Sequence, residues 1–196
     1  MGHFKQFLLL LLITFLYSEK CFAQRIQKLD DQIMINIQEH RTPEQTGVFL
    51  FLSKNYLYVN IGIPTVMMAG GLMDNNKALR ENAVYVGSST LISYGATYLI
   101  KNIFKRRRPF VQNTNIVPVY RPQDYSFPSG HSSSTFATAT ALSIAYPKWY
   151  IIAPAYLWSG SVAYSRMYLG VHYPTDVAAG ILLGTGTAAS MSFMKK

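Results

Sequence analysis

The chain has 196 residues, enough for one domain and too few for two ordinary ones. Apolar residues make up 49% of it and charged residues 14%, against about 25% charged residues in a typical soluble domain. The net charge of +9 raises the question of nucleic acid, but five of the eighteen basic residues lie within Lys101–Arg108, directly after an apolar stretch. We therefore interpret this charge as a local anion site and membrane anchor, and predict no nucleic-acid partner.

The N-terminus has the pattern of a secretory signal peptide. Lys5 precedes an apolar run, Phe7–Tyr17, and Cys21-Phe22-Ala23 offers a small-residue cleavage site. We expect residues 1–23 to be a signal peptide or, if they are not cleaved, an anchor helix. In both cases residue 24 lies on the far side of a bacterial inner membrane.

The rest of the chain predicts helices. In residues 24–55, Gln24–Arg41 has apolar and charged residues at near-helical spacing, as in an amphipathic helix lying on a membrane. Residues 56–196 form a helical domain with five apolar stretches near the lower length limit for a membrane span: Tyr56–Met73, Ala83–Ile100, Ser132–Tyr146, Trp149–Tyr164 and Val177–Met194. We predict an all-α, polytopic bundle of about five transmembrane helices. Because the mean hydropathy is only +0.12, a soluble helical protein is the alternative.

The connections between these stretches fall alternately at two ends of the predicted bundle. The motif-bearing segments Lys101–His131 and Ser165–Asp176 share one end with the start of the mature chain. A cleaved signal peptide places that end in the periplasm. The excess of Lys and Arg there opposes the positive-inside rule, but most of it is one basic cluster next to the predicted anion site.

The first block with chemical potential is basic. Lys101, Lys105 and Arg108 are spaced i, i+4 and i+7, which predicts one face of a helix that Pro109 ends. Arginine suits bidentate contact with phosphate oxygens and lysine supplies a point charge. Arg166 would add a third cation. A charged helix end also occurs as a plain interface anchor, so this block alone leaves both interpretations open.

The second block, Pro128-Ser129-Gly130-His131, predicts a helix start. Ser129 is a suitable N-cap, and Gly130 permits close approach to the backbone. The free N–H groups at such a helix start favour an anion. Ordinary helix capping uses the same residues, so this block is also weak by itself.

The third block pairs a histidine with a carboxylate. His172 and Asp176 flank Pro174, which suits the first turn of a last helix. A carboxylate bonded to one imidazole nitrogen fixes the tautomer and leaves the other nitrogen free as a nucleophile. Asp176 could instead interact only with the helix dipole, but ionisable residues within a membrane protein are functional by default.

Together the three blocks resemble the signature of the type 2 phosphatidic acid phosphatases, a superfamily shared with bacterial acid phosphatases and vanadium haloperoxidases. The signature is K-x6-RP, then PSGH, then SR-x5-H-x3-D. All eleven specified positions occur here, in order and with that spacing, from Lys101 to Asp176. Any one block would be weak, but the three in this order are highly specific.

The resemblance implies hydrolysis in two steps. It makes His172 the nucleophile that forms a phosphohistidine, Asp176 the residue that orients it, and His131 the acid and then the base. The residues that it implies for phosphate binding are Lys101, Arg108, Ser129, Gly130 and Arg166. We expect no metal and no other cofactor, since fixed cations can stabilise the charge that Mg²⁺ stabilises elsewhere.

The sequence therefore predicts a multi-pass phosphatase of the bacterial inner membrane, with its active site facing the periplasm. The expected substrate is a phosphorylated membrane lipid: lipid A, a polyprenyl pyrophosphate, phosphatidylglycerol phosphate or phosphatidate. A soluble periplasmic acid phosphatase with the same residues is one alternative. A catalytically inactive lipid-binding or transport protein is another, which the presence of His131, His172 and Asp176 disfavours. We expect Phe110–Phe127 and the N-terminal segment to select the substrate.

Overall fold

A computed structural model describes residues 23–196, in which all regular structure is helical, as predicted. The expected signal peptide, apart from its last residue, lies outside this range. Residues 23–39 are helical and coincide with the predicted amphipathic segment. The elements that follow are α2 (Pro43–Met73), α3 (Lys77–Phe104), α4 (Pro109–Gln112), α5 (Gly130–Ala145), α6 (Trp149–Tyr168), α7 (Pro174–Ser190) and the 3₁₀ helix η1 (Ser192–Met194).

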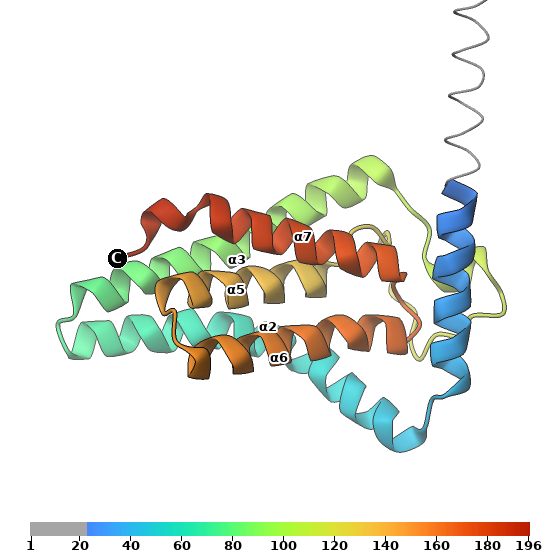
Figure 1. Cartoon of the computed structure of the whole chain (residues 1–196), viewed down its shortest axis with the longest axis horizontal. Coiled ribbons are helices and arrows are strands. Elements are labelled where there is room, and N and C mark those ends of the chain that lie inside the picture. Colours follow the sequence, from blue (N-terminus) through green and yellow to red (C-terminus); the bar gives the residue numbers. More distant parts are fainter. Residues whose placement is uncertain (1–22) are drawn as a thin grey trace, which may run out of the picture.

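The five long helices run along the length of the molecule, and the helix of residues 23–39 crosses one end of them (Figure 1). The long α3–α5 connection and the short α6–α7 connection lie at that same end, while the C-terminus lies at the other. Three of the predicted apolar stretches lie wholly within α2, α3 and α6. The stretch Ser132–Tyr146 ends one residue beyond α5, and Val177–Met194 continues past α7 through η1. Helix α2 begins at Pro43 and so continues across the boundary that the sequence suggested after residue 55.

Local chemistry fixes the helix ends that matter for the site. Thr42 caps α2 by accepting a hydrogen bond from the Gln45 amide at 3.3 Å. Ser129 caps α5, and Pro174 opens α7, as the sequence predicted. The prediction of one helical face from Lys101 to Arg108 was wrong. Helix α3 ends at Phe104, because Lys105 takes the left-handed conformation (φ 48°) that closes a helix C-terminus.

Helices α5 and α7 pack with little space between their backbones. A Cβ atom added at Gly180 would lie 2.6 Å from the Ser129 carbonyl oxygen, and one added at Gly184 would overlap the Ser133 carbonyl oxygen. Small residues four apart allow this approach, as in membrane helix pairs. The contact places the start of α5 beside the first turns of α7.

The bundle has an unusually polar interior. Hydroxyl side chains of α3 and α5 are buried against each other, and the Thr97 and Ser133 hydroxyl oxygens are 2.6 Å apart. Large apolar side chains such as Leu91, Ile103 and Leu182 are more than 70% exposed. Among the helices of residues 23–196, Pro43–Met73 is the one that has both the length and the hydropathy of a candidate membrane span.

Candidate active site

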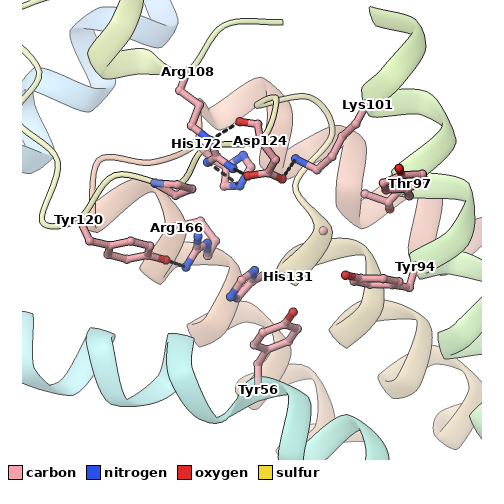
Figure 2. A pocket seen from close by; sticks show the side chains of 13 residues that line it. Tyr56, Tyr94, Thr97, Lys101, Arg108, Tyr120, Asp124, His131, Arg166 and His172 are labelled. Carbon is pink, nitrogen blue, oxygen red and sulfur yellow. Dashed lines mark hydrogen bonds and ion pairs between the residues drawn. The ribbon is translucent and has the colours of Figure 1, made fainter. Parts of the chain in front are cut away.

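A cavity of about 240 Å³ opens at the end of the bundle where the α3–α5 and α6–α7 connections meet. Figure 2 shows its side chains converging from α2, α3, α5, α6 and these connections. Six of the eight predicted site residues line it: Lys101, Arg108, Gly130, His131, Arg166 and His172. The three sequence blocks, far apart in the chain, therefore form one site.

Lys101 and Arg108 approach each other through a shared carboxylate. Lys101 projects from the last turn of α3, and its Nζ atom lies 3.0 Å from one oxygen of Asp124. The Arg108 guanidinium pairs with the other oxygen and donates to the Asp124 carbonyl at 2.8 Å. Figure 2 shows Asp124 between the two cations. Both cations are therefore ordered around an anionic group at the mouth of the cavity.

Arg166 is the most deeply buried cation of the three. It lies in the last turn of α6 and is 2% exposed. Its Nη1 atom donates to the Tyr120 hydroxyl at 2.6 Å and to the Ser53 hydroxyl. Its Nε atom has no hydrogen-bond partner among the described residues. This free donor is suited to a ligand oxygen, because a buried guanidinium N–H is costly to leave unpaired.

His131 is held by α2. Its Nε2 atom lies 3.1 Å from the Ser53 carbonyl oxygen, and its ring stacks on Tyr56 with the centroids 3.7 Å apart. A carbonyl can only accept, so in this contact Nε2 carries the hydrogen and Nδ1 of the neutral ring has the lone pair. The ring is thus fixed by contacts from a helix that the sequence motifs do not include.

His172 lies between Arg108 and Asp176. Its Nε2 atom is 3.3 Å from Arg108 Nη1, and its Nδ1 atom is 3.7 Å from the nearer Asp176 oxygen. The second distance suits an ion pair but is too long for the hydrogen bond that we expected. Burial lowers the pKa of His172 well below its ordinary value, and Arg108 and Arg166 lower that pKa further. The neutral, nucleophilic form of the imidazole is therefore favoured.

The other two predicted residues, Ser129 and Asp176, are buried beside the cavity rather than on its lining. The Ser129 hydroxyl is 3.4 Å from the Ser132 amide nitrogen, as in an N-cap, and accepts from the Ser132 hydroxyl at 2.9 Å. The Ser129 amide donates to the Asp176 carbonyl at 3.0 Å. Ser129 therefore ties the start of α5 to α7, and its place in phosphate binding stays a prediction.

Sequence reasoning missed several residues of the site. Asp124 and Tyr120 lie in the α3–α5 connection, Tyr56 lies on α2, and Arg106 pairs with Asp176 at 2.6 Å. Asp124 had a weak signal, as the one carboxylate between the basic block and the Pro-Ser-Gly-His block. For Tyr56 the sequence gives no signal, because only the folding of α2 against α5 brings its ring to His131.

The donor set of the cavity suits a phosphoryl group. Three cations face a space that also holds two imidazoles, and within residues 23–196 no group of three or more His, Cys, Asp or Glu side chains is arranged to hold a metal ion. Phosphoryl transfer depends chiefly on positioning and on stabilising negative charge. The fold and the site thus define a helical phosphoryl-transfer enzyme.

Comparison with known proteins places the chain in a family. The model of the PAP2 superfamily matches residues 82–196, and the chain belongs to that superfamily of phosphatases. It is 31% identical to an undecaprenyl-diphosphatase of Sulfolobus acidocaldarius, over 91% of this chain and 84% of the relative. It is 26% identical to a lipid A 4'-phosphatase of Porphyromonas gingivalis, over 81% and 70%.

The fold has a counterpart among solved structures. The transmembrane PAP2-type phosphatidylglycerolphosphate phosphatase of Bacillus subtilis superimposes with a TM-score of 0.67 and 20% identity, over 86% of this chain and 85% of that one. The protein accordingly shares the helical fold of that structure.

Proposed function

We propose that the protein hydrolyses a phosphate monoester or diphosphate carried by a membrane lipid, without a metal ion and at the periplasmic face of the inner membrane. The observation that carries the proposal is the junction of two cavities. The cationic cavity shares Tyr56 and Tyr94 with a groove of about 480 Å³ between α2 and α3. The groove is lined mainly by apolar side chains, including Leu57, Ile61 and Leu91. A lipid fits this pair of sites with its phosphate on the cations and its chain in the groove.

The proposed reaction has two displacements at phosphorus. The His172 imidazole attacks, and the bond from phosphorus to the leaving oxygen breaks. His131, which enters this step protonated on both ring nitrogens, donates its Nδ1 proton to that oxygen and becomes neutral. His131 then removes a proton from water, which attacks the phosphohistidine and releases inorganic phosphate and neutral His172. Asp176 balances the charge on the phosphorylated imidazole. Lys101, Arg108 and Arg166 stabilise the phosphoryl oxygens in both steps.

Among lipids, we propose a polyprenyl diphosphate. The relative that matches most of this chain at 31% identity is an undecaprenyl-diphosphatase. One groove adjoins the cationic cavity through two shared tyrosines, and a single apolar chain suits one groove better than the several acyl chains of lipid A do.

We further propose that the five long helices span the membrane. Hydroxyl groups face the interior of the bundle and large apolar side chains face outward, which suits a lipid solvent. The expected signal peptide places the cavity end in the periplasm, where the helix of residues 23–39 would lie along the membrane surface.

The test is a comparison of substrates with purified protein in detergent. Polyprenyl diphosphate, lipid A, phosphatidate and p-nitrophenyl phosphate are supplied at equal concentration, with and without excess EDTA. We expect release of phosphate fastest from polyprenyl diphosphate and unchanged by EDTA. Activity confined to the soluble ester, in a protein that a carbonate wash removes from membranes, would instead establish the soluble acid phosphatase.

A further inference from the structure

Arg106, a basic residue outside the family signature, joins two buried carboxylates. Its Nη1 atom lies 2.6 Å from Asp176, and its Nη2 atom lies 2.8 Å from Asp30 on the helix of residues 23–39. The Asp30 and Asp176 side chains are 2% and 0% exposed. The guanidinium also lies 4.2 Å from the ring centroid of Tyr173. One cation thus bridges the N-terminal helix and the first turn of α7.

The same helix holds the start of α7 by a second route. Asp30 accepts hydrogen bonds from the Thr175 amide at 3.1 Å and from the Thr175 hydroxyl. Gln27 accepts from Arg106 at 2.9 Å. The Pro174 turn, with His172 before it and Asp176 after it, is therefore fastened to the crossing helix on one side and to α5 on the other.

Arg106 supplies the positive charge that the buried carboxylates of Asp30 and Asp176 need. Burial by itself would lower the pKa of Arg106, but Asp176 and Asp30 outweigh burial and hold that pKa above its ordinary value. A buried carboxylate without a partner is strongly disfavoured. Asp176 Oδ1 faces Arg106, whereas Oδ2 faces the Nδ1 atom of His172 at 3.7 Å. The Tyr173 amide, at 3.0 Å, and the Ser126 hydroxyl donate to Oδ2. The guanidinium holds the opposite oxygen, and with these two donors it fixes the carboxylate relative to the imidazole.

We propose that Arg106 and Asp30 are positioning residues of the reaction: Asp30 on the N-terminal helix holds Arg106, and Arg106 holds the Asp176 carboxylate that orients His172. This inference rests on the proposed role of His172 as nucleophile. It makes the crossing helix part of the catalytic apparatus, although none of its residues lines the cavity.

The test uses matched neighbours in the full-length protein. Arg106→Gln is compared with Arg107→Gln at the next position, which is exposed. Asp30→Asn is compared with Asp31→Asn, whose carboxylate accepts a hydrogen bond from the Gln27 amide. Rapid quench into alkaline detergent, in which phosphohistidine is stable, with labelled p-nitrophenyl phosphate as substrate gives the rate constant and the amplitude of phosphohistidine formation. We expect Arg106→Gln and Asp30→Asn to lower the rate constant about 10- to 100-fold, with the amplitude kept. The two neighbouring variants should match the wild type.

Two further variants separate positioning from stability. Arg106→Lys keeps the charge and should recover part of the rate constant, and the Asp30→Asn/Arg106→Gln double variant should be no slower than Arg106→Gln. A fall in amplitude at an unchanged rate constant would show a merely structural role and overturn the proposal, as would equal behaviour of the matched neighbours. If the wild type forms no phosphohistidine, the proposed mechanism itself fails, and the positioning claim fails with it.

Discussion

The protonation state of His172 decides whether the site can act as a nucleophile. The imidazole is 2% exposed and close to Arg108, so a second positive charge on the ring is unfavourable. Because its pKa lies well below the ordinary value of 6.5, the ring stays neutral through neutral pH and is protonated only in more acid solution. We predict that the rate of phosphohistidine formation, measured at each pH by rapid quench into alkaline detergent, is maintained below pH 6.5 before it falls. An inflection at pH 6.5 or above that belongs to His172 would contradict this environment.

The two histidines should respond differently to the leaving group. His172→Ala should abolish turnover and phosphoenzyme alike, whereas His131→Ala should remain partly active where the leaving oxygen needs no proton. General acid assistance is worth roughly 10²–10⁴-fold. We therefore predict severe impairment of His131→Ala on an alkyl phosphate and retention of activity on p-nitrophenyl phosphate. Equal impairment on both substrates, or phosphate mapped to His131, would show that the roles are assigned wrongly.

Asp124 occupies the place between Lys101 and Arg108 that a phosphoryl group would need. Burial alone would raise the pKa of Asp124, but Arg108 and Lys101 outweigh burial and hold that pKa below its usual value. The carboxylate is therefore charged and competes with an incoming anion. Because its side chain is 58% exposed, we expect a modest effect: Asp124→Asn should tighten inhibition by inorganic phosphate about two- to fivefold. Weaker inhibition would mean that Asp124 helps to hold the anion.

At the scale of elements, the contact between α5 and α7 holds the catalytic residues in place. A Cβ atom added at Gly184 would overlap the Ser133 carbonyl oxygen and lie 2.9 Å from the Ala137 amide nitrogen. The methyl group of an alanine there must therefore push the two helices apart. We predict that Gly184→Ala lowers the free energy of unfolding by about 1–3 kcal/mol and reduces activity. Thermal unfolding in detergent is the measurement. Gly186→Ala is the control, since a Cβ there has no heavy atom within 4 Å; equal effects at both positions would exclude this packing argument.

Sequence reasoning succeeded for elements whose ends are set locally. Ser129 and Pro174 mark the starts of α5 and α7, because capping and the fixed φ of proline act within a few residues. It failed for the end of α3, where Lys105 turns left-handed although its neighbours continue a helical charge pattern. The roles of Arg106, Asp124 and Tyr56 were hidden for a different reason. Their partners are distant in sequence, so only tertiary packing brings them together.

Over the whole molecule, the distribution of polarity agrees with the proposed setting. Hydroxyl side chains of α3 and α5 bond one another inside the bundle, as Thr90 and Thr138 do at 2.7 Å. Leu99, Leu157 and Leu182 are exposed on its outside. The α2–α3 turn lies at the end where Lys196 meets Asn82 at 2.9 Å, opposite the catalytic cavity (Figure 1). The two ends of the bundle should therefore face opposite sides of the membrane.

This arrangement gives a prediction about orientation. Lys77 begins α3 at the end away from the site, whereas Arg121 lies in the α3–α5 connection beside it, and both are exposed. In a Cys21→Ser background, which removes the one native cysteine, Lys77→Cys and Arg121→Cys are treated with a membrane-impermeant maleimide on intact spheroplasts. We expect labelling at position 121 only, and at both positions after permeabilisation. Labelling at 77 but not at 121 would invert the orientation and place the chemistry in the cytoplasm, because the cationic cavity and Arg121 belong to the same end of the bundle.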